Sequence, residues 1–93
     1  MSILVRFSPT NLTAEKYQES LRLLEEKGLW PHPDGLDVHV FFGSEGNMRV
    51  IEIWDSQEQL EAFGAQLMPI LSEIGLEFSG EPEVLEVHNI SKR

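Results

Sequence analysis

Four stretches of the chain have the alternating apolar and polar residues, or the β-branched and aromatic runs, that are typical of β-strands. They cover residues 3–7, 36–42, 48–54 and 84–90. Two longer stretches carry apolar residues at three- and four-residue steps, which predicts amphipathic helices. The predicted order is β-α-β-β-α-β, in a single domain of residues 1–93.

The helix boundaries are marked by capping residues. Thr13 is a suitable N-cap for the first helix, and Gly28 suits the left-handed residue that ends it. The second helix is predicted to begin at Asp55, with Glu58 at the capping-box spacing. Pro69 lies inside its apolar pattern and should kink it or start a second helical piece. The apolar stripes are Ala14, Tyr17, Leu21 and Leu24, and then Leu60, Phe63, Leu67, Leu71 and Ile74.

Two connections are predicted to be irregular. Residues 29–35 contain two prolines and a glycine, so residues 30–34 form either a lid over a site or a plain link stiffened by proline. Residues 43–47 are typical of a hairpin turn. Because two helices cannot sandwich so small a sheet, both should cover one face of a four-stranded antiparallel sheet. The predicted fold class is α+β, ferredoxin-like.

The two faces of this sheet are expected to differ. A uniformly apolar set should lie beneath the helices: Ile3, Val5, Phe7, Val38, Val40, Phe42, Ile51, Ile53, Leu85 and Val87. The opposite set mixes apolar with ionisable side chains: Leu4, Arg6, Asp37, His39, Phe41, Val50, Glu52, Trp54, Val84, Glu86, His88 and Ile90. A half-buried face accommodates both kinds, so we predict that a second copy of the chain covers it or that it lines a cavity.

Composition narrows the classes of partner. Seven basic and sixteen acidic residues give a net charge of −9, which would repel nucleic acid and anionic membrane surfaces. With no cysteine there is no disulfide framework, thiolate metal site or cysteine nucleophile. No apolar run is long enough for a membrane helix, and the first residues lack the basic region of a signal peptide. We therefore expect a cytoplasmic protein.

The segment VIEIWDS at residues 50–56, followed by LEAF at residues 60–63, resembles the dimeric α+β barrel superfamily. Within it the chain is similar to small proteins of the antibiotic biosynthesis monooxygenase type. The resemblance covers nearly the whole chain. It implies a homodimer in which two sheets face each other, with a pocket in each subunit between the sheet and its helices or loops.

The activities in that superfamily include cofactor-free oxygenation of aromatic molecules and several kinds of haem chemistry. The Asn-Trp-His arrangement of the haem-degrading members does not match this chain. Arg6 stands in the first strand instead of Asn, Trp54 lies at a strand end, and neither predicted helix contains a histidine. The resemblance therefore implies an activity that needs no cofactor.

Candidate chemistry rests on ionisable residues of the mixed face. A histidine beside a carboxylate is a candidate general base, and here this is His39 or His88 with Glu52 or Glu86. It would remove a phenolic or C–H proton and leave a carbanion that reacts with oxygen. Alternatively, these groups satisfy one another as hydrogen-bonded pairs beneath a dimer contact. A divalent metal held by two histidines and two carboxylates is a weaker alternative, since no His-x-x-x-His motif supports it, so no metal is expected.

Three further residues complete the predicted site. Arg6 is a candidate for binding a substrate carboxylate or enolate, or for pairing with a glutamate instead. Trp54 and Phe41 are candidates for the wall of a planar apolar ligand, or for ordinary interface anchors. The leading hypothesis is a cofactor-independent monooxygenase acting on a planar aromatic or quinone-like molecule. The alternative is a non-catalytic, small-molecule-binding or stress-related dimeric module.

Overall fold

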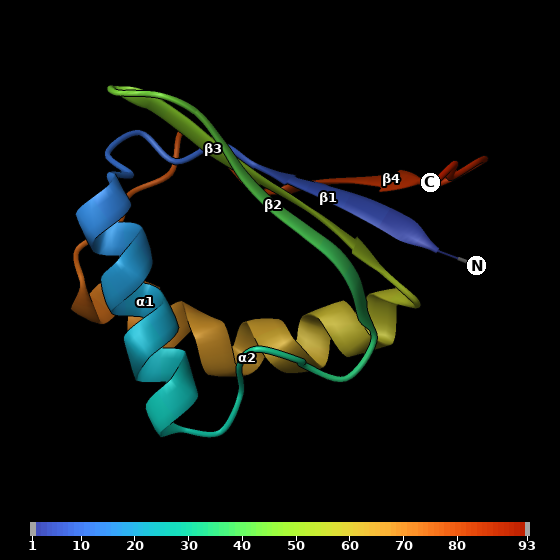
Figure 1. Ribbon diagram of the computed structural model, residues 1–93, viewed down its shortest axis with the longest axis horizontal. Coiled ribbons are helices and arrows are strands. Elements are labelled where there is room, and N and C mark those ends of the chain that lie inside the picture. Colours follow the sequence, from blue (N-terminus) through green and yellow to red (C-terminus); the bar gives the residue numbers. More distant parts are fainter. Residues whose placement is uncertain (1, 93) are drawn as a thin grey trace.

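The computed structural model describes residues 2–92, and Met1 and Arg93 lie outside it. The elements are β1 (Ile3–Phe7), α1 (Ala14–Glu26), β2 (Leu36–Ser44), β3 (Asn47–Trp54), α2 (Gln57–Glu73) and β4 (Glu83–Glu86). The strands pair antiparallel in the order β2-β3-β1-β4. Both helices lie on the same face of this sheet (Figure 1). The predicted ferredoxin-like α+β fold is confirmed.

The helix boundaries follow from side chains that accept backbone hydrogen bonds. Thr13 caps α1 as predicted, and its hydroxyl accepts from the Lys16 amide at 3.1 Å. The predicted start of the second helix is wrong by one residue, because Ser56 is the N-cap of α2 and accepts from the Gln59 amide at 3.2 Å. Pro69 lies within α2, which runs as one helix instead of two pieces.

The strand ends also differ from the prediction. The hairpin strands β2 and β3 continue to a tight turn, with Ser44 paired to Asn47. In contrast, β4 ends at Glu86, four residues before the predicted end at Ile90. Glu86 is opposite Ile3, the first residue of β1, and beyond this pair the Val87 amide still donates to the Ser2 carbonyl at 3.0 Å. The regular ladder ends there because β1 itself begins at Ile3.

The core lies between the sheet and the helices. Val5, Trp54 and Ile70 have no solvent exposure, and Leu24 and Phe63 complete the buried cluster. The rings of Trp54 and Phe63 are tilted against each other with centroids 5.3 Å apart. Each such burial stabilises the fold by about 1.5–3 kcal/mol, so this cluster holds α2 to β3 and β1.

The pairing of β1 with β3 overturns the predicted faces of three strands. Val5 is opposite Glu52, and Arg6 is opposite Ile51. The β1 set beneath the helices is as predicted, but on β2, β3 and β4 it is the mixed set that shares this face. The prediction failed because alternation shows which residues of one strand share a face, whereas only the register between strands relates one strand to the next.

The face away from the helices is therefore mainly apolar, and we call this surface the open face. It carries Leu4, Arg6, Val38, Val40, Phe42, Arg49, Ile51, Ile53, Glu83 and Leu85. Three of its large apolar side chains are exposed by more than a third, namely Val40, Phe42 and Leu85.

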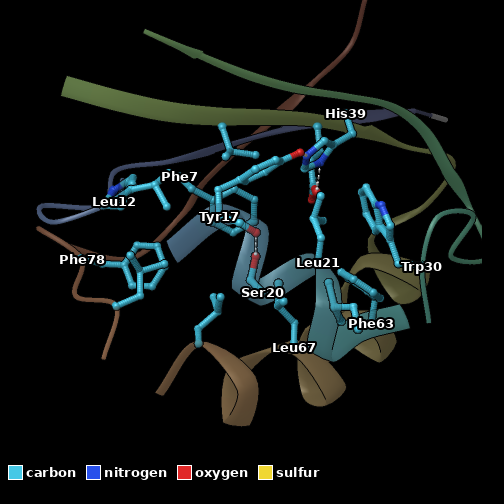
Figure 2. Close-up of a pocket in the computed structure, with 16 residues that line it drawn as sticks. Phe7, Leu12, Tyr17, Ser20, Leu21, Trp30, His39, Phe63, Leu67 and Phe78 are labelled. Carbon is cyan, nitrogen blue, oxygen red and sulfur yellow. Dashed lines mark hydrogen bonds and ion pairs between the residues drawn. The ribbon is translucent and has the colours of Figure 1, made fainter. Parts of the chain in front are cut away.

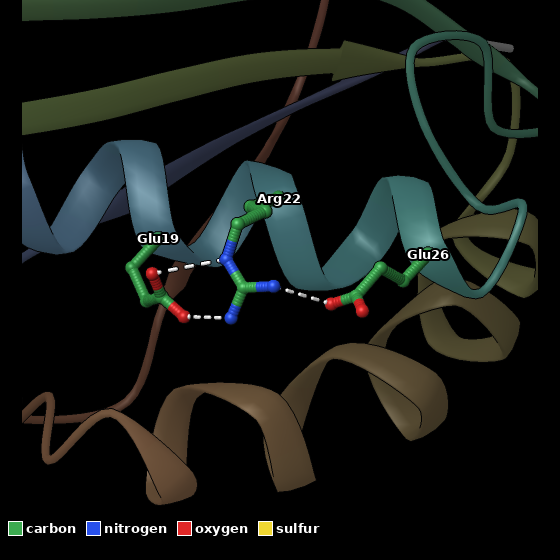
Figure 3. A network of polar contacts seen from close by, with 3 residues as sticks. All are labelled: Glu19, Arg22 and Glu26. Carbon is green, nitrogen blue, oxygen red and sulfur yellow. Dashed lines mark hydrogen bonds and ion pairs between the residues drawn. The ribbon is translucent and has the colours of Figure 1, made fainter.

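The exposed side of α1 carries charge rather than apolar groups. Arg22 donates hydrogen bonds to Glu19 one turn earlier and to Glu26 one turn later (Figure 3). The hydrogen bonds from Arg22 lower the pKa of the Glu19 carboxyl below its ordinary value. Exposed pairs of this kind add little stability, so they mark a solvated surface rather than a site.

Candidate functional site

A cavity of about 70 Å³ lies between the sheet and the two helices. Its walls are Phe7, Pro9, Leu12, Tyr17, Ser20, Leu21, Leu24, Trp30, His39, Val50, Glu52, Phe63, Leu67, Leu71, Leu76 and Phe78 (Figure 2). Most of these side chains are aliphatic or aromatic. Among those with polar groups, Tyr17, His39 and Glu52 are joined by hydrogen bonds into one chain.

This polar chain runs from α1 across the sheet. The Tyr17 hydroxyl lies 2.8 Å from Nε2 of His39, and the second ring nitrogen, Nδ1, lies 2.7 Å from Oε2 of Glu52. The other carboxylate oxygen, Oε1, accepts a hydrogen bond of 3.1 Å from the indole N–H of Trp54. Tyr17, His39, Glu52 and Trp54 therefore form one continuous network, which we call the Tyr17–Trp54 chain.

Local structure explains why these residues meet. His39 and Glu52 are direct partners in the β2–β3 ladder, so their side chains leave the sheet on the same face. Trp54 follows Glu52 by two residues and therefore shares that face. Tyr17 lies in the first turn of α1 and points from the helix toward His39 (Figure 2).

The hydrogen bonds fix the direction of the chain. An indole N–H can only donate, so Oε1 of Glu52 accepts. With Glu52 as a carboxylate, Nδ1 of His39 carries a proton and donates to Oε2. Nε2 is then the acceptor for the Tyr17 hydroxyl. Glu52 is only 3% exposed, and these two N–H donors satisfy a carboxylate that would otherwise be costly to bury.

Aromatic rings surround the junction of Tyr17 and His39. The Tyr17 ring stacks on Phe41 with centroids 3.9 Å apart and an angle of 5°. Trp30 meets the His39 ring edge-on at 4.8 Å. Burial, and then the negative charge of Glu52, raise the pKa of Tyr17 above its ordinary value of 10.0. At neutral pH the hydroxyl therefore keeps its proton and donates a hydrogen bond to Nε2 of His39.

Four of the seven residues predicted from the sequence come together here. His39 and Glu52 line the cavity, Trp54 supports Glu52 from within the core, and Phe41 supports the ring of Tyr17. Trp54 itself does not line the cavity, because its side chain is fully buried behind Glu52, and a role for it in ligand binding stays a prediction.

The other three predicted residues lie elsewhere. Arg6 is on the open face and pairs with Glu83 at 3.4 Å, so neither predicted partner, Glu52 nor Glu86, is the one it contacts. Glu86 is exposed at the end of β4, and His88 is exposed beyond it. None of the three lines the cavity. A catalytic role for them stays a prediction.

Among the cavity residues that were absent from the predicted site, Tyr17 and Trp30 lie beside His39. Tyr17 was placed only in the apolar stripe of a helix. A tyrosine in a buried stripe has a hydroxyl that needs a partner, and this signal would have found it. Trp30 belongs to the connection for which a lid was considered, and it forms one wall beside His39.

Residues 2–92 were also searched for metal-binding groups and for helices that could cross a membrane. No group of three or more histidine, aspartate or glutamate side chains in this part of the chain is arranged to hold a metal ion. Of the helices described, neither has the length and apolarity that crossing a membrane requires.

No protein-family model matches this chain, and no curated protein sequence matches it. Solved structures do. SnoaB, a cofactor-independent oxygenase from Streptomyces nogalater, is similar with a TM-score of 0.60 and 17% identity, over 96% of this chain and 93% of that one. An uncharacterized NIPSNAP-like domain protein from Burkholderia xenovorans gives a TM-score of 0.54 and 14% identity, over 99% and 88%.

A conserved protein from Methanosarcina mazei Go1 is also similar, with a TM-score of 0.52 and 21% identity, over 90% of this chain and 88% of that one. At these identities the likeness shows the fold and carries no activity with it. The chain shares its α+β fold, a four-stranded antiparallel sheet with two helices on one face, with SnoaB and the NIPSNAP-like protein.

Proposed function

We propose that this chain is a cofactor-independent monooxygenase that acts on a small planar aromatic or quinone-like molecule in the cavity. The observation that carries the proposal is the Tyr17–Trp54 chain, which sets a histidine–carboxylate pair into an otherwise apolar pocket. A pair of this kind is suited to proton removal, because the carboxylate orients the imidazole and balances the charge it gains. The fold shared with SnoaB supports the proposal.

The reaction needs only the substrate and dioxygen. Transfer of the substrate's hydroxyl proton to His39, either directly or through Tyr17, leaves an electron-rich substrate anion. This anion passes one electron to O₂. The two radicals combine at the ring carbon beside the anionic oxygen, and protonation gives a hydroperoxide. Loss of water from this carbon leaves a carbonyl. Overall, one C–H group and one O–H group are oxidised, one oxygen atom enters the product, and the other leaves as water.

The size of the cavity limits the substrate. Its volume of about 70 Å³ is far below the roughly 300–1,000 Å³ of pockets that hold drug-sized ligands. A cavity of about 150 Å³ holds benzene, so we expect a substrate of one ring at most, and Trp30 must move away from His39 to admit it. 1,4-Dihydroxybenzene is a suitable first probe, and its monooxygenation product is 2-hydroxy-1,4-benzoquinone.

The test measures oxygen uptake with this probe and follows ¹⁸O₂ into the product by mass spectrometry. We expect one labelled atom in the product. His39→Gln should lower the rate by about 10²–10⁴-fold, the usual contribution of a positioned base. His32→Gln is the matched control, because His32 is exposed in the connection after α1 and does not line the cavity. Equal rates for both variants, or no uptake by the unaltered protein, would refute the proposal.

The alternative, a non-catalytic binding module, is favoured by one observation. Within residues 2–92 no buried side-chain nitrogen or oxygen lacks a hydrogen-bond partner, so the network is complete without a substrate. A binding module would retain the probe in calorimetry, show no oxygen uptake, and bind equally well with and without air.

A homodimer through the open face belongs to the same proposal. The open face exposes Val40, Phe42 and Leu85, and contiguous apolar patches on a soluble chain mark interaction sites. The cavity lies on the other side of the sheet, so a partner on the open face would leave it accessible.

A further inference from the structure

Neither ring nitrogen of His39 is free to meet a ligand. Nδ1 is held by Glu52 and Nε2 by the hydroxyl of Tyr17, at 2.7 Å and 2.8 Å. The His39 side chain is 17% exposed, and Trp30 covers one edge of its ring. The Tyr17 oxygen lies at the end of this network and lines the cavity, whereas both nitrogens of the imidazole are already hydrogen-bonded.

We infer that Tyr17 is the residue that exchanges a proton with the ligand, that His39 and Glu52 act behind it as its proton store, and that the ligand is an uncharged aromatic molecule with an acidic hydroxyl group. The inference deepens the proposed function and rests on it for the place of the ligand.

The proton transfer needs only the ligand and the residues of the Tyr17–Trp54 chain, and its bonds and charges balance. As the ligand O–H bond breaks, its proton forms a new O–H bond on Tyr17. The original Tyr17 proton moves to Nε2 of His39, and its O–H bond electrons stay on the tyrosine oxygen. Tyr17 is again a neutral phenol at the end and donates a hydrogen bond to the ligand anion. The imidazolium that results lies against the carboxylate of Glu52.

The position of Tyr17 suits this role. Stacking on Phe41 fixes its ring, and the Ser20 hydroxyl donates to its backbone carbonyl at 2.6 Å. Its raised pKa disfavours a tyrosinate that persists alone. The hydroxyl is thus a relay that passes a proton on to His39 and does not store the charge itself.

The charges of the cavity define the class of ligand. Among the described residues that line it there is no lysine or arginine, and Glu52 carries the formal negative charge. A carboxylate or phosphate would be repelled and would find no cation to pair with. A neutral phenol enters without this cost and becomes charged only after its proton has passed to His39.

The test uses 4-nitrophenol, whose anion absorbs visible light, in the absence of oxygen and at a pH below the pKa of this phenol. Nitrobenzene is the matched ligand without a hydroxyl. With the unaltered protein we expect 4-nitrophenol to bind and to show the absorbance of its anion. Tyr17→Phe keeps the ring on Phe41 and should lower the anion signal of the bound ligand at least about tenfold, the equivalent of one pKa unit. Nitrobenzene binding should not change.

The competing arrangement gives the opposite result. If His39 took the proton directly, Tyr17→Phe would free Nε2, and the anion signal would be kept or would increase. Either outcome overturns the inference, as does failure of the unaltered protein to distinguish 4-nitrophenol from nitrobenzene. His32→Gln is the control for the substitution, and circular dichroism checks that Tyr17→Phe is folded.

The measurement needs no oxygen and no turnover, so it separates the inference from the proposed function. A Tyr17-dependent anion signal together with no oxygen uptake would keep the relay and reject the monooxygenase. Oxygen uptake that survives Tyr17→Phe would keep the monooxygenase and reject the relay.

Discussion

Removing the buried carboxylate of Glu52 should destabilise the protein mainly through the donors it leaves behind. In Glu52→Ala the indole N–H of Trp54, which is fully buried, and the Nδ1–H of His39 both lose their acceptor. Each buried donor without a partner costs about 1–3 kcal/mol. Part of this is offset because a desolvated charge is also removed. We expect a net loss of about 2–4 kcal/mol from a total that is typically about 5–15 kcal/mol.

Glu52→Gln separates the donors from the charge. The amide oxygen can accept from Trp54 while the amide NH₂ donates to Nδ1 of His39, provided that the histidine changes tautomer. Nε2–H then donates to the Tyr17 oxygen and the Tyr17 proton turns toward the cavity, so one partly exposed donor loses its acceptor instead of two donors at Glu52. The expected loss is below about 1.5 kcal/mol. The difference between the two variants is therefore the cost of the unpaired donors.

The assay is urea unfolding followed by tryptophan fluorescence, at one fixed protein concentration because assembly would make stability concentration-dependent. Glu86→Ala is the control, since Glu86 is exposed on β4 and should change the free energy of unfolding by no more than about 0.5 kcal/mol. The reasoning fails if Glu52→Ala unfolds at the same urea concentration as the unaltered protein, or if Glu52→Gln loses as much as Glu52→Ala.

Three further outcomes are expected from the structure. Tyr17 is the single tyrosine of the chain, so ultraviolet absorbance reports its ionisation directly; we expect a midpoint above 10.0. The tyrosine of the unfolded chain loses its proton at a lower pH than Tyr17 of the folded chain. The free energy of unfolding should therefore fall as pH rises above 10.0, and Tyr17→Phe should have a flatter alkaline profile. A midpoint at the ordinary value would contradict this. Trp30→Ala should cost about 1–3 kcal/mol of stability, because this side chain is only half-buried. It should also strengthen the binding of 2-naphthol relative to phenol in calorimetry, and an unchanged preference would show that Trp30 does not limit ligand size. Phe42→Glu on the open face should convert a dimer to monomers in sedimentation at micromolar concentration, whereas Met68→Glu, exposed on α2, should not; a monomeric unaltered protein would remove the dimer from the proposal.

The sequence by itself determined the elements and their order. Hydrophobic periodicity located both helices and all four strands, because it records which side of each element is buried. Thr13 marked the start of α1, and the turn residues between β2 and β3 marked the hairpin. These signals are local, since each one depends on residues that are neighbours in the chain. His39 and Glu52 were also placed on one predicted face, together with His88 and Glu86, but which histidine meets which glutamate was left open.

Only the tertiary structure decided which side of the sheet the helices cover. The mixed residues of β2, β3 and β4 lie beneath them because Trp54 fills the core and because His39, Glu52 and Trp54 satisfy one another there. The aliphatic residues of β2 and β3 are left on the open face. The partner that completes the network, Tyr17, comes from α1, 22 residues before His39. Contacts between distant segments depend on strand register and packing, and a pattern read along one strand contains neither.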